Sequence, residues 1–208
     1  MRWNSEDNVP VKNVKMHKVV ILDCSGSMQG AKYDAAEAGV KLDYEGCKNE
    51  FTDYLLVEFS NSHRSNLYNF TTPLKFSPSY GGTALYDTIE VVFKHLLETT
   101  PKEDKVLIQV FTDGMDMHSK SGSKLRARSL VEEFNSKGWT VTFVGTQYDV
   151  EYIQSNLSID ATNTLTHDNT ASGVANSFEV YRGATSNYTK SVKRGESVVK
   201  GFFKSIKQ

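Results

Sequence analysis

One run of four aliphatic residues that ends at an aspartate constrains the fold of this chain more than any other feature. The run Val19, Val20, Ile21 and Leu22 is followed at once by Asp23 and then by a helix-like segment. A short apolar run bounded by polar residues is typical of an interior strand in a parallel sheet, which is buried on both faces. In open α/β sheets, ligands bind just beyond the carboxyl ends of such strands. The sequence therefore predicts a buried strand with a functional group at its carboxyl end.

Three loops supply oxygen-bearing side chains that suit a small hard cation. The loop after the first strand carries Asp23, Ser25 and Ser27 at alternating positions, Thr83 follows two glycines, and Asp113 follows a second apolar run. Carboxylate and hydroxyl oxygens suit Mg²⁺, which retains several waters and takes few protein ligands. For the first loop alone, a turn that caps the next helix is an alternative, because Asp and Ser are favoured at such positions.

Taken together, the five residues resemble the metal-ion-dependent adhesion site of von Willebrand factor type A (vWA) domains. The family pattern is Asp-x-Ser-x-Ser, then a Thr after a Gly-rich turn, then an Asp in a Thr-Asp-Gly segment, and every element is present here in that order. The resemblance covers about residues 17–165 and is greatest to stand-alone vWA proteins of bacteria and phages.

The resemblance implies a metal site formed by Asp23, Ser25, Ser27, Thr83 and Asp113. The expected ion is Mg²⁺, with Mn²⁺ or Ca²⁺ as alternatives. In the family, the two serines bind the ion directly, the two aspartates act largely through water, and the threonine joins or leaves with conformational state. An Asp or Glu of a partner protein completes the coordination. The implied function is a metal-dependent protein-binding module.

A Mg²⁺-dependent phosphohydrolase that uses Asp23 is the alternative, because such enzymes share the doubly wound architecture. They require a second carboxylate, the general acid and base, two residues after the nucleophile, and Ser25 stands at that position here. The sequence also contains no Gly-x-Ser-x-Gly elbow, P-loop or dinucleotide-binding glycine motif. We therefore expect no catalytic residues and no enzymatic activity.

Composition excludes several other classes of function. The net charge of −1 over 208 residues argues against a nucleic-acid partner or capture by an acidic membrane surface. Residues 1–18 lack the apolar core of a secretory signal, and no apolar run is long enough to span a membrane. Cys24 and Cys47 form no metal-binding or CxxC motif and are expected to stay reduced. These features predict a cytoplasmic protein.

The remaining sequence alternates between strand-like and helix-like segments. This alternation predicts an α/β fold with a doubly wound, mostly parallel central sheet, one short antiparallel edge strand at 66–70, and helices on both faces. Further strands are expected at 54–59, 106–111, 139–144 and 164–166, and helices at 30–49, 85–98, 123–137, 149–157 and 171–182.

Residues beside the predicted metal loops suggest an interface. Met28, Tyr80 and Met115 flank the loops, and an apolar rim would suit a protein-binding surface. His118 and Asp116 lie near Asp113 in the sequence, but a solvated loop position for His118 and a helix-capping role for Asp116 are the favoured interpretations.

The C-terminal segment extends beyond the family pattern. It is rich in lysine and arginine, and Val199, Phe202, Phe203 and Ile206 fall at helical spacing. Such a helix docks on its own domain, the favoured interpretation, or binds a partner's groove or an acidic surface. The predicted organisation is an N-terminal extension at 1–16, a vWA domain at 17–182, and a basic amphipathic helix at 183–208.

Overall fold

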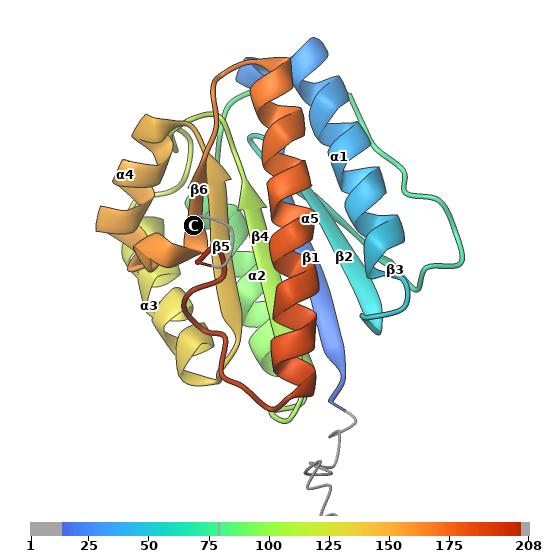
Figure 1. Cartoon of the computed structure of the whole chain (residues 1–208). Coiled ribbons are helices and arrows are strands. Elements are labelled where there is room, and N and C mark those ends of the chain that lie inside the picture. The colour runs from blue at the N-terminus through green and yellow to red at the C-terminus, as the bar shows by residue number, and fades with distance from the viewer. Residues whose placement is uncertain (1–13, 79, 205–208) are drawn as a thin grey trace, which may run out of the picture.

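Six strands form one twisted sheet in the order β3-β2-β1-β4-β5-β6 (Figure 1). The structure is a computed structural model that describes residues 14–78 and 80–204. All neighbouring strands are parallel except β2 and β3, which form an antiparallel hairpin at one edge. The strands are β1 (Met16–Asp23), β2 (Asp53–Phe59), β3 (His63–Tyr68), β4 (Lys105–Phe111), β5 (Thr140–Gly145) and β6 (Thr164–Thr166). The predicted fold class is therefore confirmed.

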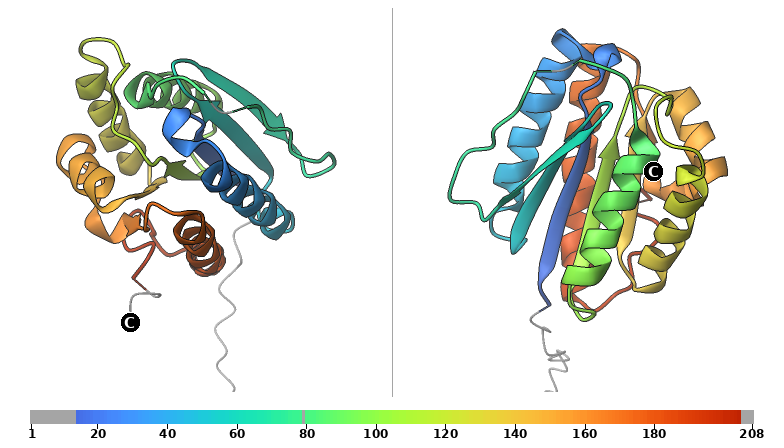
Figure 2. Two further views of the ribbon diagram at one scale, coloured as in Figure 1. Left: turned by 90° about the horizontal axis from the view of Figure 1, so that it is seen from above. Right: turned by 180° about the vertical axis from the view of Figure 1, so that it is seen from behind.

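Helices cover both faces of the sheet (Figures 1 and 2). One face is covered by α1 (Ala31–Cys47) and α5 (Ala171–Lys193), and the other by α2 (Leu85–Thr99), α3 (Ser123–Ser136) and α4 (Gln147–Leu157). Short 3₁₀ turns, Gly26–Met28 and Ala161–Asn163, lie in the loops after β1 and before β6. Among the described residues, no helix is long and apolar enough to cross a membrane.

The central strand β1 is buried on both faces, as its apolar run predicts. Val20 and Leu22 pack in the layer of α1 and α5, whereas Val19 and Ile21 pack in the layer of α2 and α3. Since parallel strands end at the same edge, the loops after β1 and β4 are brought together there.

The edge hairpin begins earlier than predicted. Strand β3 spans His63–Tyr68 rather than 66–70. Its first residues are polar and exposed, so they carry no apolar pattern that would announce a strand. The hairpin is closed tightly, because the amide of Ser60 donates to the carbonyl of Ser62 over 2.8 Å.

The last helix differs most from the prediction. Helix α5 continues to Lys193, so the predicted domain boundary at 182/183 falls inside it. Gly195 has a φ of 77°, a left-handed conformation that ends the helix. Residues 183–193 are therefore helical as part of α5, whereas no helix follows from Arg194 to Lys204, so the prediction of a separate helix over 183–208 is wrong there. Ile206 and its neighbours lie outside them, as do residues 1–13 of the predicted N-terminal extension.

The non-helical C-terminal segment is nonetheless docked on the domain. Phe202 and Phe203 are buried in the core beside Tyr181. The amide of Phe203 donates to the carbonyl of Thr162 over 3.0 Å, and that of Phe202 to Asn163 Oδ1 over 3.0 Å. These backbone groups bond to the loop before β6, and the amide of Lys204 donates to the carbonyl of Gly201 over 3.1 Å, so the segment docks through a turn rather than a helix.

Candidate metal centre

Three loops meet at the carboxyl edge of β1 and β4. The amide of Gly26, in the first loop, donates to the carbonyl of Gly81 over 2.9 Å. The carbonyl of Thr83 in turn accepts from the amides of Met117 and His118, at 3.0 and 3.1 Å. These backbone bonds hold the glycine loop between the loops that follow the two strands.

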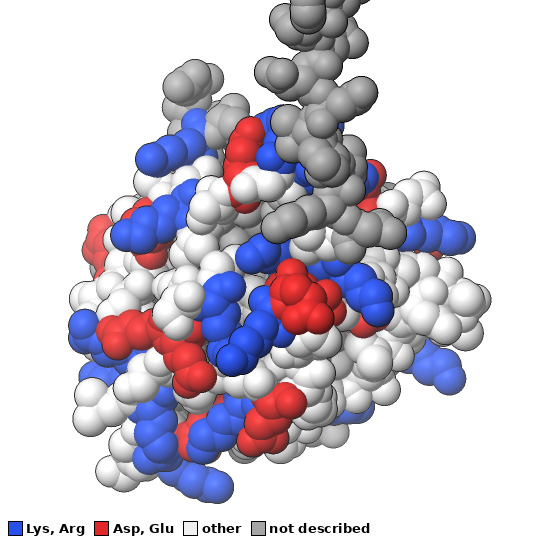
Figure 3. All heavy atoms as spheres, turned by 90° about the horizontal axis from the view of Figure 1, so that it is seen from below, with Lys and Arg blue, Asp and Glu red and all other residues white. Residues whose placement is uncertain are grey.

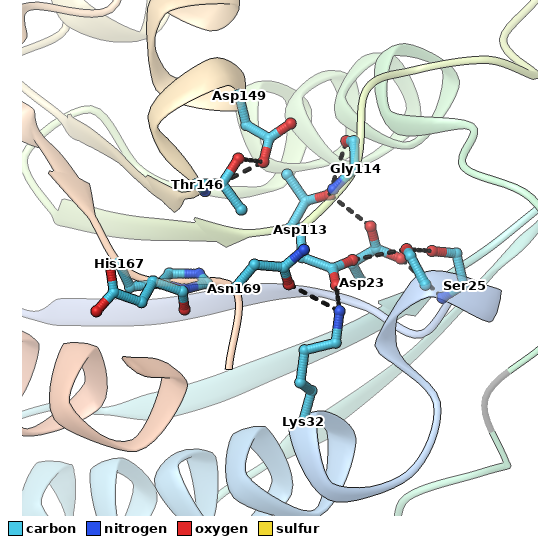
Figure 4. A network of polar contacts seen from close by, with 12 residues as sticks. Asp23, Ser25, Lys32, Asp113, Gly114, Thr146, Asp149, His167 and Asn169 are labelled. Carbon is cyan, nitrogen blue, oxygen red and sulfur yellow. Dashed lines mark hydrogen bonds and ion pairs between the residues drawn. The ribbon is translucent and has the colours of Figure 1, made fainter. Parts of the chain in front are cut away.

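Their hydroxyl and carboxylate oxygens lie close together. Ser25 Oγ is 3.0 Å from Ser27 Oγ, and Ser27 Oγ donates to Asp113 Oδ1 over 2.6 Å (Figure 4). A Cβ atom added to Gly114 would lie 3.4 Å from Ser27 Oγ and 3.6 Å from Thr83 Oγ1. Both hydroxyls thus face the same glycine, and a Cβ atom there would make ordinary van der Waals contact with them. The structure therefore brings together Ser25, Ser27, Thr83 and Asp113.

Asp23 lies beneath these groups and holds the first loop in shape. Its side chain is fully buried; Oδ1 accepts from the amide of Ser25 over 2.7 Å, and Oδ2 accepts from the hydroxyl of Thr112. Burial raises the pKa of Asp23 to about 6, and the neighbouring charge of Asp113 adds to the shift. A cation beside this carboxyl would favour its ionised form.

Lys32, on the first turn of α1, is a charged neighbour that the sequence did not reveal. Its ammonium donates to Asp113 Oδ2 and, over 2.8 Å, to Asn169 Oδ1 (Figure 4). Thr112 and Asn169 were also missed. The one available signal was a lysine at a helix N-terminus, where acidic residues are favoured.

The flanking residues follow the predictions only in part. Tyr80 and Met115 are exposed, at 67% and 49%, but Met28 is fully buried in the core, so its predicted place in an apolar rim is wrong. Met28 belongs to the 3₁₀ turn that folds back over β1. Asp116 accepts from the first-turn amide of Tyr86 over 3.3 Å, which is the expected helix-capping role.

His118 does more than face solvent. Its Nδ1 accepts from the amide of Thr83 over 3.2 Å, and its ring lies so close to Gly82 that a Cβ there would be 2.1 Å from the imidazole. His118 therefore supports the glycine loop. The thiol of Cys24 donates to the carbonyl of Phe59 over 3.1 Å, away from the hydroxyls, as expected.

The oxygen donors fit a hard divalent cation. Within the described parts of the chain, no group of three His, Cys, Asp or Glu side chains could hold a metal ion, so a site here depends on hydroxyls. Three hydroxyls with one directly adjacent carboxylate suit Mg²⁺ or Mn²⁺ and offer no soft nitrogen or sulfur ligand.

Solved structures share this architecture, whereas no family model and no curated protein matches the sequence. The pilus adhesin SpaC from Lactobacillus rhamnosus GG aligns with a TM-score of 0.63 and 17% identity, over 88% of this chain and 31% of that protein. The ArnB paralog VWA2 from Sulfolobus acidocaldarius aligns with a TM-score of 0.58 and 18% identity, over 81% of this chain and 45% of that one. The chain has a vWA-like fold.

A third vWA-like structure, the manganese-loaded TRAP protein from Plasmodium vivax, aligns with a TM-score of 0.53 and 15% identity, over 79% of this chain and 73% of that protein. This chain spans less than half of SpaC and of VWA2. At these identities the likeness establishes the vWA-like fold alone.

Proposed function

We propose that this vWA-like domain binds another protein through a divalent cation, Mg²⁺ or Mn²⁺, held by Asp23, Ser25, Ser27, Thr83 and Asp113. The observation that carries the proposal is the convergence of hydroxyl and carboxylate oxygens from three loops at one sheet edge. When bound, the ion supplies a positive centre for an Asp or Glu carboxylate of the partner. The pilus adhesin and the manganese-loaded neighbour support this proposal at the level of the fold.

Exposed apolar side chains around the site support a protein partner. Tyr80, Met115 and Met117 are 67%, 49% and 73% exposed. Tyr80 directly precedes the glycine loop, Met115 lies two residues after Asp113, and the amide of Met117 donates to the carbonyl of Thr83. Aromatic residues and methionine are enriched at protein interfaces. The proposed partner surface therefore carries an acidic residue flanked by apolar ones.

We propose that the domain is not an enzyme. Asp23, the nucleophile of the alternative phosphohydrolase, is fully buried, and both of its oxygens already accept hydrogen bonds. An attacking carboxylate needs access to the substrate, so this environment argues against that role.

A cytoplasmic location and the absence of a nucleic-acid partner remain parts of the proposal. Cys24 and Cys47 are both buried in the core, and a reducing compartment is the location that we propose for them. On the face seen from below, acidic and basic side chains are interspersed rather than gathered into one basic field (Figure 3).

Calorimetric titration with MnCl₂ and MgCl₂ tests the metal site. The wild type should bind one ion, and Asp113→Asn should lose most of the heat because a charged oxygen beside the hydroxyls is removed. Asp34→Asn is the control, since Asp34 is an exposed acidic residue on the first turn of α1 and belongs to none of the three loops. Equal binding by all three proteins would contradict the site.

Affinity purification tests the partner. A protein recovered by the wild type with Mg²⁺, but absent with EDTA and absent with Asp113→Asn, is the expected result. A screen of phosphate esters with Mg²⁺ should stay at background. Turnover that disappears in Asp23→Asn would instead favour the phosphohydrolase.

A further inference from the structure

The contact between Lys32 and Asp113 places a fixed positive charge beside the proposed cation site. Asp113 has two differently engaged oxygens: Oδ1 accepts from Ser27, and Oδ2 accepts from the Lys32 ammonium (Figure 4). The Asp113 side chain is 0% exposed and that of Lys32 is 19% exposed. Solvent and salt therefore screen this pair less than they screen a surface ion pair.

The position of Lys32 costs free energy, which its contact with Asp113 must offset. A cation on the first turn of a helix is repelled by the helix dipole, and ordering a lysine side chain costs conformational entropy. Asn169, from the loop before α5, adds a second acceptor at 2.8 Å and fixes the ammonium in place. Lys32 is thus a positioned charge.

Lys32 changes the charge that a bound ion would meet. Asp23 and Asp113 contribute two negative charges when ionised and Lys32 contributes one positive charge, so a divalent ion would leave the centre positive rather than neutral. Metal affinity rises with the negative charge of the ligand set, and a positive centre attracts a carboxylate more strongly than a neutral one.

We infer that Lys32 sets the charge of the metal centre, weakening the affinity for the cation and strengthening the affinity of the loaded domain for a partner carboxylate. This inference rests on the proposed function. It assigns to Lys32 a positioning and tuning role rather than a ligand role, since an ammonium donates and cannot coordinate a cation.

The test compares Lys32→Met with the wild type by Mn²⁺ titration. Lys32→Met should bind Mn²⁺ more tightly, on the order of tenfold, because one nearby positive charge is removed. Lys32→Arg keeps the charge and should bind within about twofold of the wild type. Asn169→Ala removes the second acceptor of the Lys32 ammonium without changing the charge, and its Mn²⁺ affinity should stay near that of the wild type. This variant separates the effect of the charge from the effect of fixing the lysine in place.

Lys41→Met is the matched control, because it removes the same charge from the same helix. Lys41 is nine residues further along α1, about 13 Å away, and its side chain is 54% exposed beside Glu37. Its Mn²⁺ affinity should equal that of the wild type. Melting curves without added metal establish that each variant is folded.

Acetate serves as the carboxylate probe on the Mn²⁺-loaded proteins, followed by water-proton relaxation. Acetate should bind Lys32→Met several-fold more weakly than the wild type. Unchanged or weaker Mn²⁺ binding by folded Lys32→Met, or equal acetate affinity, would overturn the inference while the proposed function stands. Failure of the wild type to bind Mn²⁺ would overturn the proposed function itself and this inference with it.

Discussion

Single side chains at both ends of β1 tie this strand to its neighbours. At the carboxyl end, Asp23 accepts from the hydroxyl of Thr112, the residue that follows β4. At the amino end, His17 Nδ1 lies 2.9 Å from Asp53 Oδ2, and His17 Nε2 lies 3.0 Å from Asp104 Oδ2. The imidazole therefore bridges two carboxylates that precede or begin the flanking strands, and both contacts are strongest when it is protonated.

The first prediction concerns the pH dependence of the His17 bridge. Hydrogen bonding to Asp53, reinforced by Asp104 and opposed by burial, raises the pKa of His17 above its ordinary value of 6.5. A raised folded-state pKa contributes stability that is fully present below about pH 6.5 and is lost as the pH rises through the folded value. His17→Gln should therefore be less stable than the wild type by about 1–3 kcal/mol at pH 5.5, and by less at pH 8.5.

Urea denaturation at both pH values measures this difference. His63→Gln is the control, because His63 is exposed on the edge strand β3. His63→Gln should change the free energy of unfolding by the same small amount at both pH values. A His17→Gln deficit that is independent of pH would show that the imidazole bridges its partners without gaining a proton.

At the scale of elements, α1 and α5 approach closely at a glycine. A Cβ atom added to Gly39 would lie 2.4–2.8 Å from three atoms of Phe178, which is 2% exposed. This contact holds α5 against α1 over the same sheet face. The hydrogen bond between Lys32 and Asn169 joins the N-terminal end of α1 to the loop before α5. A glycine in the middle of a helix is thus explained by interhelical packing rather than by a turn.

The second prediction is that Gly39→Ala destabilises the domain. Alanine favours helix by up to about 1 kcal/mol, but overpacking against Phe178 should outweigh that gain and leave a net loss of about 1–3 kcal/mol. Gly46→Ala in the same helix is the control, because a Cβ there meets nothing within 4 Å. Gly46→Ala should be neutral or stabilising by up to about 1 kcal/mol in urea denaturation. Equal stabilisation by both substitutions would show that α5 moves aside freely.

Across the whole molecule, the C-terminal segment closes the core rather than extending from it. Thr140 Oγ1 donates to the carbonyl of Val198 over 2.9 Å, and Asn163 Nδ2 donates to that of Val199 over 2.6 Å. Phe203 is fully buried in the layer of α1 and α5. A segment outside the recognised family pattern therefore contributes to the same core as the central strands.

The third prediction is that Phe203→Ala costs about 3–5 kcal/mol of unfolding free energy, because it removes a fully buried aromatic ring. Lys200→Ala is the control in the same segment, since its side chain is 71% exposed and its ion pair with Asp160 lies at the surface. That change should cost no more than about 1 kcal/mol. Thermal melting measures both. A melting temperature unchanged in Phe203→Ala would indicate that the segment is a detachable partner-binding arm.

Local sequence pattern predicted most of the strands and helices and the loops that carry the oxygen-bearing side chains. The apolar run of β1 and the alternation around it predicted a mostly parallel sheet, because burial on both faces leaves a continuous hydrophobic signature. The shared edge of parallel strands then predicted that Ser25, Ser27 and Asp113 would converge, which the structure bears out. The first residues of β3 have no apolar periodicity, and there the predicted start of the strand was three residues too late.

Contacts between distant segments were decided only by the tertiary structure. Lys32 and Asp113 are 81 positions apart, and His17 and Asp104 are 87 positions apart; neither pair has a local signature. The C-terminal aromatic residues fell at helical spacing, yet Gly195 ended the helix and the backbone found partners at Thr162 and Asn163 instead. Periodicity reports which side of an element is apolar, whereas the partner it meets depends on register and packing across the whole core.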